Sequence, residues 1–232
     1  MDSDNALMST IRRDWAAQLA AAVHASSLPE SFLAAIVANE SGGHAAVSRF
    51  EPAVFTRLVN VAAGRQAAFS CPGSRKPLTA PDLLAYASPG ELQPSQVVAE
   101  YQGPPFQPAP PGAPARGLQW GLKRLSDLAT SFGLCQVMGW HLVEMAGYAG
   151  WAWTVGDLLD GAKNLQCAVA LASYFAVRYE LDLSKDFEQL LRCWNCGTPD
   201  GTTFDPMYVP NGLARSAAYA ALSISPAAPP AA

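Results

Sequence analysis

Glu40 is the residue whose type and position most clearly suggest chemistry. Upstream of it, apolar residues recur at intervals of three and four, as on the buried face of a helix: Phe32, Leu33, Ile36 and Val37. Glu40 continues that face, so we expect a partly desolvated carboxyl group at the negative end of the helix dipole, with a raised pKa. A carboxylic acid that keeps its proton near neutral pH can protonate the leaving oxygen of a glycosidic bond. A helix-end Glu that points into solvent is the alternative.

Three later segments carry side chains that could bind a sugar. Residues 131–140 read SFGLCQVMGW, residues 192–197 read RCWNCG, and Tyr208 lies in MYVPNGL. Gln136 and Asn195 are amides, which donate and accept hydrogen bonds and so suit N-acetyl groups and sugar hydroxyls. Their alternative role is to bridge backbone groups. Aromatic residues that can stack on sugars or pack in a core cluster nearby: Phe132, Trp140, Tyr148, Trp151 and Trp153.

The order Glu-Ser, Gly-Leu-x-Gln, aromatic-Asn-x-Gly and a late Tyr resembles the lysozyme-like superfamily, in particular soluble lytic transglycosylases of bacterial cell walls and goose-type lysozymes. The matching segments span roughly residues 29–213, and Asn164-Leu165 resembles that family's Asn-Ile helix. The resemblance implies that Glu40 is the catalytic acid and that the hydroxyl of the late Tyr reaches toward it. It also implies a set of substrate-binding residues: Ser41, Ser131, Gln136, Met138, Asn195 and Tyr208.

Two segments resemble another branch, the phage N-acetylmuramidase endolysins. Residues 50–55 read FEPAVF and residues 136–139 read QVMG. In a muramidase a second carboxylate activates water, and Glu51 is the candidate, with an ion pair to Arg49 or Arg57 as its alternative role. In a lytic transglycosylase the 6-hydroxyl of muramic acid attacks its own C1, so one carboxylate acts as acid and then as base.

We therefore expect a glycosidase that cleaves the MurNAc-GlcNAc β-1,4 bond of peptidoglycan. The motif order favours a lytic transglycosylase that leaves 1,6-anhydro-muramic ends. A hydrolytic muramidase that uses Glu51 is the alternative, and a non-catalytic phage-tail or wall-binding component is a further one.

Bulk composition excludes some classes of protein. The chain has 232 residues, of which half are hydrophobic, and a net charge of −4, which is unlike a basic nucleic-acid-binding surface. No apolar run approaches the roughly 18 residues of a membrane span, and the first residues lack a secretory signal pattern. We expect a monomer that is made in the cytoplasm and reaches peptidoglycan strands by phage or secretion machinery.

Cysteine usage argues against a metal or redox centre. Five cysteines are an odd number, so they cannot all pair within one chain. Cys193 and Cys196 have C-x-x-C spacing, but no second such pair exists and the chain has only three histidines. We expect reduced thiols, no metal and no cofactor.

Periodicity and breakers predict a mainly α fold, namely a lysozyme-like helical domain with a small β or extended segment beside the active-site cleft. One domain over residues 1–225 should carry a Pro-rich insertion at about 69–117, followed by a disordered tail at 226–232. The extended segment is expected at 44–52. Helices are expected at 5–25, 29–41, 53–63, 80–87, 94–101, 118–129, 135–146, 157–179, 184–194 and 213–222.

Overall fold

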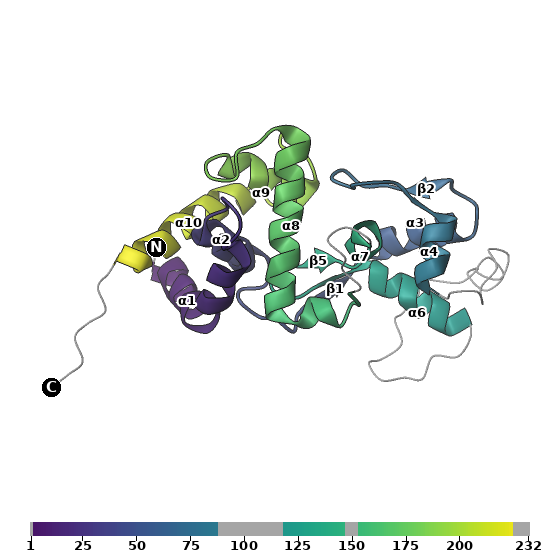
Figure 1. The fold of residues 1–232 in the computed structure, drawn as a ribbon, viewed down its shortest axis with the longest axis horizontal. Coiled ribbons are helices and arrows are strands. Elements are labelled where there is room, and N and C mark those ends of the chain that lie inside the picture. The colour runs from purple at the N-terminus through teal and green to yellow at the C-terminus, as the bar shows by residue number, and fades with distance from the viewer. Residues whose placement is uncertain (1, 88–117, 147–152, 225–232) are drawn as a thin grey trace. The chain divides into compact units, whose positions relative to one another are not determined.

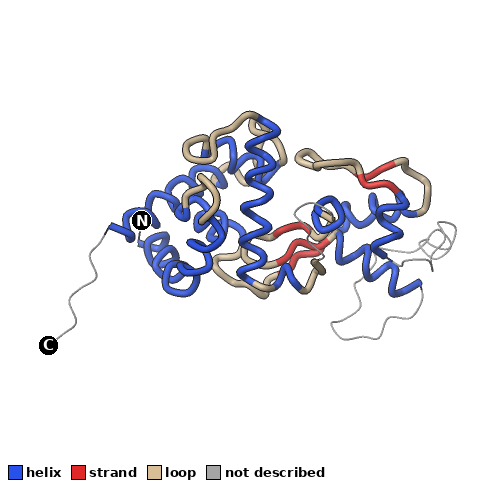
Figure 2. The backbone as a smooth tube through the Cα atoms, in the orientation of Figure 1, coloured by secondary structure: helices blue, strands red, loops and turns tan. Residues whose placement is uncertain are grey.

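A computed structural model describes residues 2–87, 118–146 and 153–224. Within these ranges the chain is mainly helical with two small sheets (Figures 1 and 2), which confirms the expected fold class. The chain divides into two compact units, the first formed by residues 1–47, 133–135 and 160–232, and the second by 48–132 and 136–159. The lysozyme-like arrangement and the single catalytic domain stay predictions. The helix expected at 94–101 and the tail at 226–232 lie outside the described residues.

Among the described residues of the first unit there are five helices: α1 (Asp2–Val23), α2 (Glu30–Glu40), α8 (Gly161–Tyr179), α9 (Phe187–Cys196) and α10 (Tyr208–Ile224). Helix α2 packs most extensively on α10 and also contacts α1 and α8 (Figure 1). All residues from 32 to 38 are buried, so α2 is covered on every side and not only along the apolar stripe that its sequence suggests. Small side chains at Ala34, Ala35 and Ala38 let neighbouring helices approach those other sides.

Local signals explain where α8 and α10 begin. The Asp160 side chain accepts a hydrogen bond from the Lys163 N–H at 3.0 Å and caps α8, after the short 3₁₀ helix η1 (Asp157–Leu159). Helix α10 begins at Tyr208, five residues before the predicted start at 213. Pro210 lies in its first turn, where a missing N–H breaks no hydrogen bond within the helix.

In the part of the second unit that the structure describes, there are two small sheets and four α-helices. Strands β1 (Ser48–Phe50), β4 (Thr130–Phe132) and β5 (Val137–Met138) form an antiparallel sheet in the order β1-β4-β5. Strands β2 (Ala68–Phe69) and β3 (Leu78–Thr79) form a separate antiparallel pair. The helices are α3 (Pro52–Ala62), α4 (Ala80–Ala87), α6 (Leu118–Leu128) and α7 (His141–Met145).

The helix predicted at 135–146 is wrong in its first half. Gln136 has a left-handed φ of 48°, Val137–Met138 pairs with β4, and only His141–Met145 is helical. Gly139 explains the difference, because its N–H donates to the Thr130 carbonyl at 2.8 Å. A Cβ at Gly139 would lie 2.2 Å from the carbonyl oxygen of Asp127, so the backbone of this turn packs directly on the end of α6. This long-range contact outweighs the local helical periodicity.

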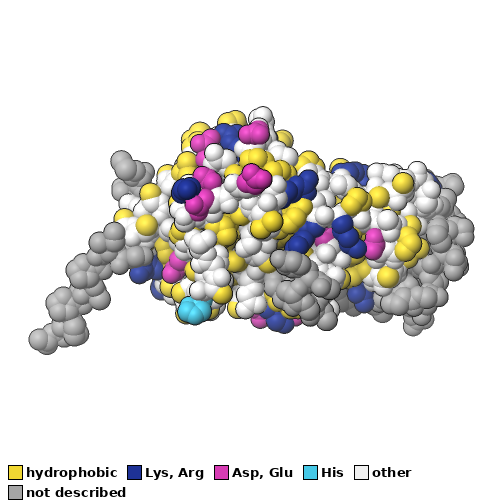
Figure 3. All heavy atoms as spheres, turned by 45° about the horizontal axis from the view of Figure 1, so that its top comes forward, with side chains coloured by type: hydrophobic (Ala, Val, Ile, Leu, Met, Phe, Trp, Pro, Cys, Tyr) yellow, Lys and Arg dark blue, Asp and Glu magenta, His cyan; other side chains and the backbone are white. Residues whose placement is uncertain are grey.

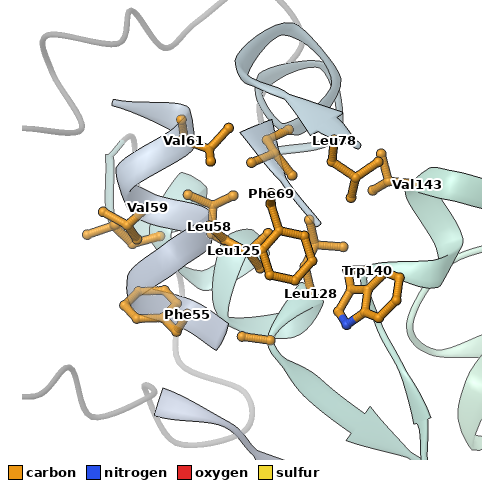
Figure 4. Packing of buried hydrophobic residues seen from close by; sticks show 14 residues of the cluster. Phe55, Leu58, Val59, Val61, Phe69, Leu78, Leu125, Leu128, Trp140 and Val143 are labelled. Carbon is orange, nitrogen blue, oxygen red and sulfur yellow. The ribbon is translucent and has the colours of Figure 1, made fainter. Parts of the chain in front are cut away.

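The core of the second unit draws on the first part of the Pro-rich insertion. Phe69, Leu78 and Leu83 are fully buried in the same cluster as Phe55 and Trp140 (Figure 4). The Phe69 and Trp140 rings meet edge to face, with centroids 5.6 Å apart. Residues on both sides of the change in composition near residue 69 therefore belong to one hydrophobic core. Residues 88–117, which hold the rest of the insertion, lie outside the described residues.

Candidate active site

A hydrogen bond between Glu40 and Tyr208 forms the centre of the candidate site. Glu40 is the last residue of α2, and Tyr208 is the first residue of α10. The Tyr208 hydroxyl donates to Oε1 of Glu40. Tyr208 is buried and Glu40 is half-buried, so the carboxyl group sits at the edge of the packed interior. Packing of α10 on α2 thus brings together two residues that are far apart in the sequence.

Two groups that stay neutral, Tyr208 and Cys135, lie near this carboxyl group. Burial raises the pKa of the Tyr208 phenol well above its usual range, and the negative charge of Glu40 and its hydrogen bond raise it further. Burial also raises the pKa of the Cys135 thiol well above its usual range, again with a contribution from Glu40. Both groups therefore keep their protons at physiological pH, and Tyr208 acts as a permanent hydrogen-bond donor to Glu40.

Ser41 ties the Glu-Ser motif to the Gly-Leu motif. Its hydroxyl donates to the Leu134 carbonyl oxygen at 2.7 Å and accepts from the Gly43 N–H at 3.2 Å. The indole N–H of Trp15 donates to the Gly43 carbonyl at 3.0 Å and holds the same turn. Ser41 therefore orders the backbone just after Glu40.

Asn164 anchors the chain on the other side of Leu134. Its side chain is fully buried, and its Oδ1 accepts from the Cys135 N–H at 2.8 Å. A buried backbone N–H needs such a partner, because leaving it unpaired costs about 1–3 kcal/mol. Asn164, in the first turn of α8, therefore holds the backbone at residues 134–135, where the Leu134 carbonyl contacts Ser41.

Four predicted site residues belong to the second unit. The Ser131 hydroxyl donates to Oε1 of Gln136 at 2.8 Å, and Met138 packs partly against the core of that unit. Glu51 forms an ion pair with Arg49, with 2.7 Å between Oε1 and the guanidinium Nε. This ion pair is the alternative role that the sequence suggested for Glu51.

Asn195 contacts a loop that sequence reasoning did not single out. Asn195 is exposed, and its Oδ1 accepts from the Phe204 N–H at 3.2 Å. Phe204 is 100% exposed, and Met207, three residues later, is 53% exposed. An aromatic ring held fully in water four residues before Tyr208 is a candidate sugar-stacking surface. Its signal in the sequence is a Phe among turn-forming residues, in GTTFDP.

Two residues of the predicted aromatic cluster are not available at the surface. Phe132 and Trp140 are buried, and Trp153 is half-buried. Tyr148 and Trp151 lie outside the described residues. Packing, and not sugar contact, therefore accounts for Phe132 and Trp140.

The described residues offer no candidate metal centre. All five cysteines are free thiols, and within the described ranges no group of three or more His, Cys, Asp or Glu side chains could hold a metal ion. Among the helices described, none has the length and apolarity to cross a membrane. Figure 3 shows acidic and basic side chains together with hydrophobic ones on the face drawn.

No protein-family model matches this chain, and no curated protein or solved structure matches it. The candidate site therefore rests on its own geometry. Three of the predicted residues, Glu40, Ser41 and Tyr208, lie in one hydrogen-bonded region of the first unit, where Leu134 and Asn164 join them.

Proposed function

We propose that this protein is a peptidoglycan-cleaving glycosidase that acts on the MurNAc-GlcNAc β-1,4 bond, and that it is a lytic transglycosylase. The observation that carries the proposal is the hydrogen bond from the Tyr208 hydroxyl to Glu40. It joins the first and the last motif of the order that resembles the lytic transglycosylases. The contact of Ser41 with Leu134 links the Glu-Ser motif to the Gly-Leu motif, and the contact of Asn164 with Cys135 links the latter to the long helix.

In the proposed reaction Glu40 acts first as an acid and then as a base. It gives its proton to the glycosidic oxygen, which leaves as the 4-hydroxyl of GlcNAc when its bond to C1 of MurNAc breaks. The 6-hydroxyl of the same MurNAc then bonds to C1 and returns its proton to Glu40. No water is consumed, so a single carboxylate suffices. Tyr208 holds that carboxylate in one orientation during both transfers.

The surroundings of Glu51 favour this outcome over hydrolysis. A general base must be free to approach a water molecule, whereas the Glu51 carboxylate is engaged by the Arg49 guanidinium. The exposed ring of Phe204 supports a carbohydrate substrate, since the C–H faces of sugars stack on aromatic rings.

Mass analysis of muropeptides released from purified peptidoglycan tests the proposal. The native protein should release products lighter than hydrolysis products by the mass of one water. Glu40→Gln keeps the shape of the side chain but cannot supply the proton, so activity should fall by about 10²–10⁴-fold. Glu51→Gln, the matched carboxylate-to-amide control, should only weaken activity.

Two results would overturn the proposal in different ways. Reducing muramic ends that take up labelled oxygen from water, with activity lost in Glu51→Gln, would identify a hydrolytic muramidase. Binding to peptidoglycan without any cleavage would identify a wall-binding component. Cleavage that survives in Glu40→Gln within a factor of a few would remove Glu40 from the mechanism.

A further inference from the structure

A second layer of polar contacts lies behind the Glu40–Tyr208 pair. Asn39 precedes Glu40 in the last turn of α2, and its Nδ2 donates to the backbone carbonyl of Tyr208 at 2.9 Å. The Arg215 Nη1 donates to Oδ1 of Asn39 at 2.8 Å. Two neighbouring residues of α2 thus bind one residue of α10, Glu40 through the Tyr208 hydroxyl and Asn39 through its carbonyl.

Arg215 determines which way the Asn39 amide points. A guanidinium has only donors, so the atom of Asn39 that faces Arg215 must be the oxygen. The amide nitrogen is then directed to the Tyr208 carbonyl, which has only acceptors. Neither contact could be satisfied if the amide were turned over, so the two partners together select one orientation.

Arg215 is itself held in place. Its Nε donates to Oδ1 of Asp4 in α1 at 3.0 Å, and its side chain is only 20% exposed. A planar guanidinium can bind two acceptors at once in a fixed geometry, which a lysine ammonium cannot do as well. The contacts therefore run from Asp4 through Arg215 and Asn39 to Tyr208.

Gly212 provides the space for this arrangement. It lies one turn after Tyr208 in α10, and a Cβ there would lie 3.2 Å from Nδ2 of Asn39 and 2.7 Å from a methyl group of Leu191. The absence of a side chain lets α10 approach closely enough for Asn39 to reach the Tyr208 carbonyl.

We propose that Asn39 and Arg215 are positioning residues that hold Tyr208 against Glu40. The inference rests on the proposed function only where it concerns the reaction rate, because the hydrogen bonds themselves are independent of any substrate. The raised pKa of Tyr208, caused by burial and by Glu40, supplies a signal that reports this placement directly.

The test uses three variants of the full chain and one matched control. Asn39→Asp keeps the contact with Arg215 but removes the donor to Tyr208. Arg215→Met removes the guanidinium, and Arg215→Lys is the conservative rescue. Tyr219→Phe is the control, because the Tyr219 hydroxyl donates to Glu30 and links the same two helices at the other end of α2.

The first measurement follows the Tyr208 phenol by NMR with ¹³Cζ-labelled tyrosine, its signal being assigned as the one of seven that is absent in Tyr208→Phe. In Arg215→Met its titration should move down toward the ordinary value of about 10, since burial and contact with Glu40 are lost. Asn39→Asp is followed by its cleavage rate alone, because the added negative charge itself raises the pKa of the Tyr208 phenol. Tyr219→Phe should leave the Tyr208 titration unchanged. An unchanged Tyr208 titration in Arg215→Met would overturn the inference.

The second measurement is the rate of peptidoglycan cleavage. Both Asn39→Asp and Arg215→Met should lower kcat by about 10- to 100-fold with KM near the native value, because a small displacement of a catalytic group has this effect. Arg215→Lys should recover part of the loss. An equal loss in Tyr219→Phe would show that the effect is only structural.

The two proposals fail separately. Absence of cleavage by the native protein would refute the proposed function and leave the NMR result as the test of positioning. Cleavage lost in Glu40→Gln, together with a native Tyr208 titration in Arg215→Met, would refute the positioning role alone.

Discussion

Replacing Tyr208 by Phe removes a single hydroxyl group from the centre of the candidate site. A hydrogen bond to a charged group contributes about 1.5–3 kcal/mol to stability. Glu40 is half-buried, so water can replace part of the lost contact, and we expect the interaction between Tyr208 and Glu40 to contribute about 1–2 kcal/mol at a pH where Glu40 is ionised. Both partners lie in the first unit, so the change should affect the packing of α2 on α10.

A double-mutant cycle measures this interaction. The free energy of unfolding in urea is compared for the native protein, Tyr208→Phe, Glu40→Ala and the double variant. The coupling between the two changes should be about 1–2 kcal/mol, well above the roughly 0.5 kcal/mol expected for independent sites. Melting temperature should fall by about 2–4 °C for each kcal/mol.

The same variant has a predicted effect on catalysis. Without the hydroxyl the carboxyl group of Glu40 is less well oriented, and the rate of wall lysis should fall by about 10- to 100-fold. The alkaline limb of the pH profile should move to higher pH, because a hydrogen bond donated to a carboxylate favours its ionised form. Coupling below about 0.5 kcal/mol together with native lysis rates would refute the reasoning.

Four other predictions address the acid, the loop, the buried thiols and the insertion. Lysis should persist to neutral pH and decline as Glu40 ionises, so a steady rise from about pH 6 to 9 would contradict its role as an acid. Phe204→Ala should weaken sedimentation with peptidoglycan without changing the melting temperature. The control Val177→Ala, at an 82% exposed site in α8, should change neither. Equal binding by both variants would exclude Phe204 from the sugar-binding surface. Burial raises the pKa of Cys167 from 9.0 to about 12, so above pH 9 the unfolded chain releases a proton that the folded state keeps. The free energy of unfolding should therefore be constant below pH 9 and decrease above it by up to about 1.4 kcal/mol per pH unit for each such group. In Cys167→Ala this decrease with pH should be smaller. An equally steep decrease in Cys167→Ala would contradict the prediction. Replacing residues 103–116 by a Gly/Ser linker of equal length should change the melting temperature little, and a large loss of stability would show that the segment packs.

Several features of the fold follow from local sequence patterns. The predicted helices at 29–41, 53–63 and 80–87 correspond closely to α2, α3 and α4, since each has regular apolar spacing and clear breakers at its ends. The prediction at 135–146 was wrong where Gly139 and Gln136 let the chain turn back along β4. The contact of Gly139 with the end of α6 is long-range, so no window of local sequence contains it.

Some features of the candidate site also follow from the local sequence, and others depend on tertiary contacts. The sequence by itself determined that Glu40 ends an apolar helix and that a Tyr follows late in the motif order, because helical periodicity and residue type are local properties. The resemblance implied that the Tyr208 hydroxyl reaches toward Glu40, but only the tertiary structure decided that the two residues are hydrogen-bonded. The contacts of Asn39 with Tyr208 and with Arg215 had no signal in the sequence. The tertiary structure also decided that Glu51 is paired with Arg49. Such contacts depend on which helix faces pack together, and that choice is made by the whole set of buried side chains and close approaches such as the one at Gly212.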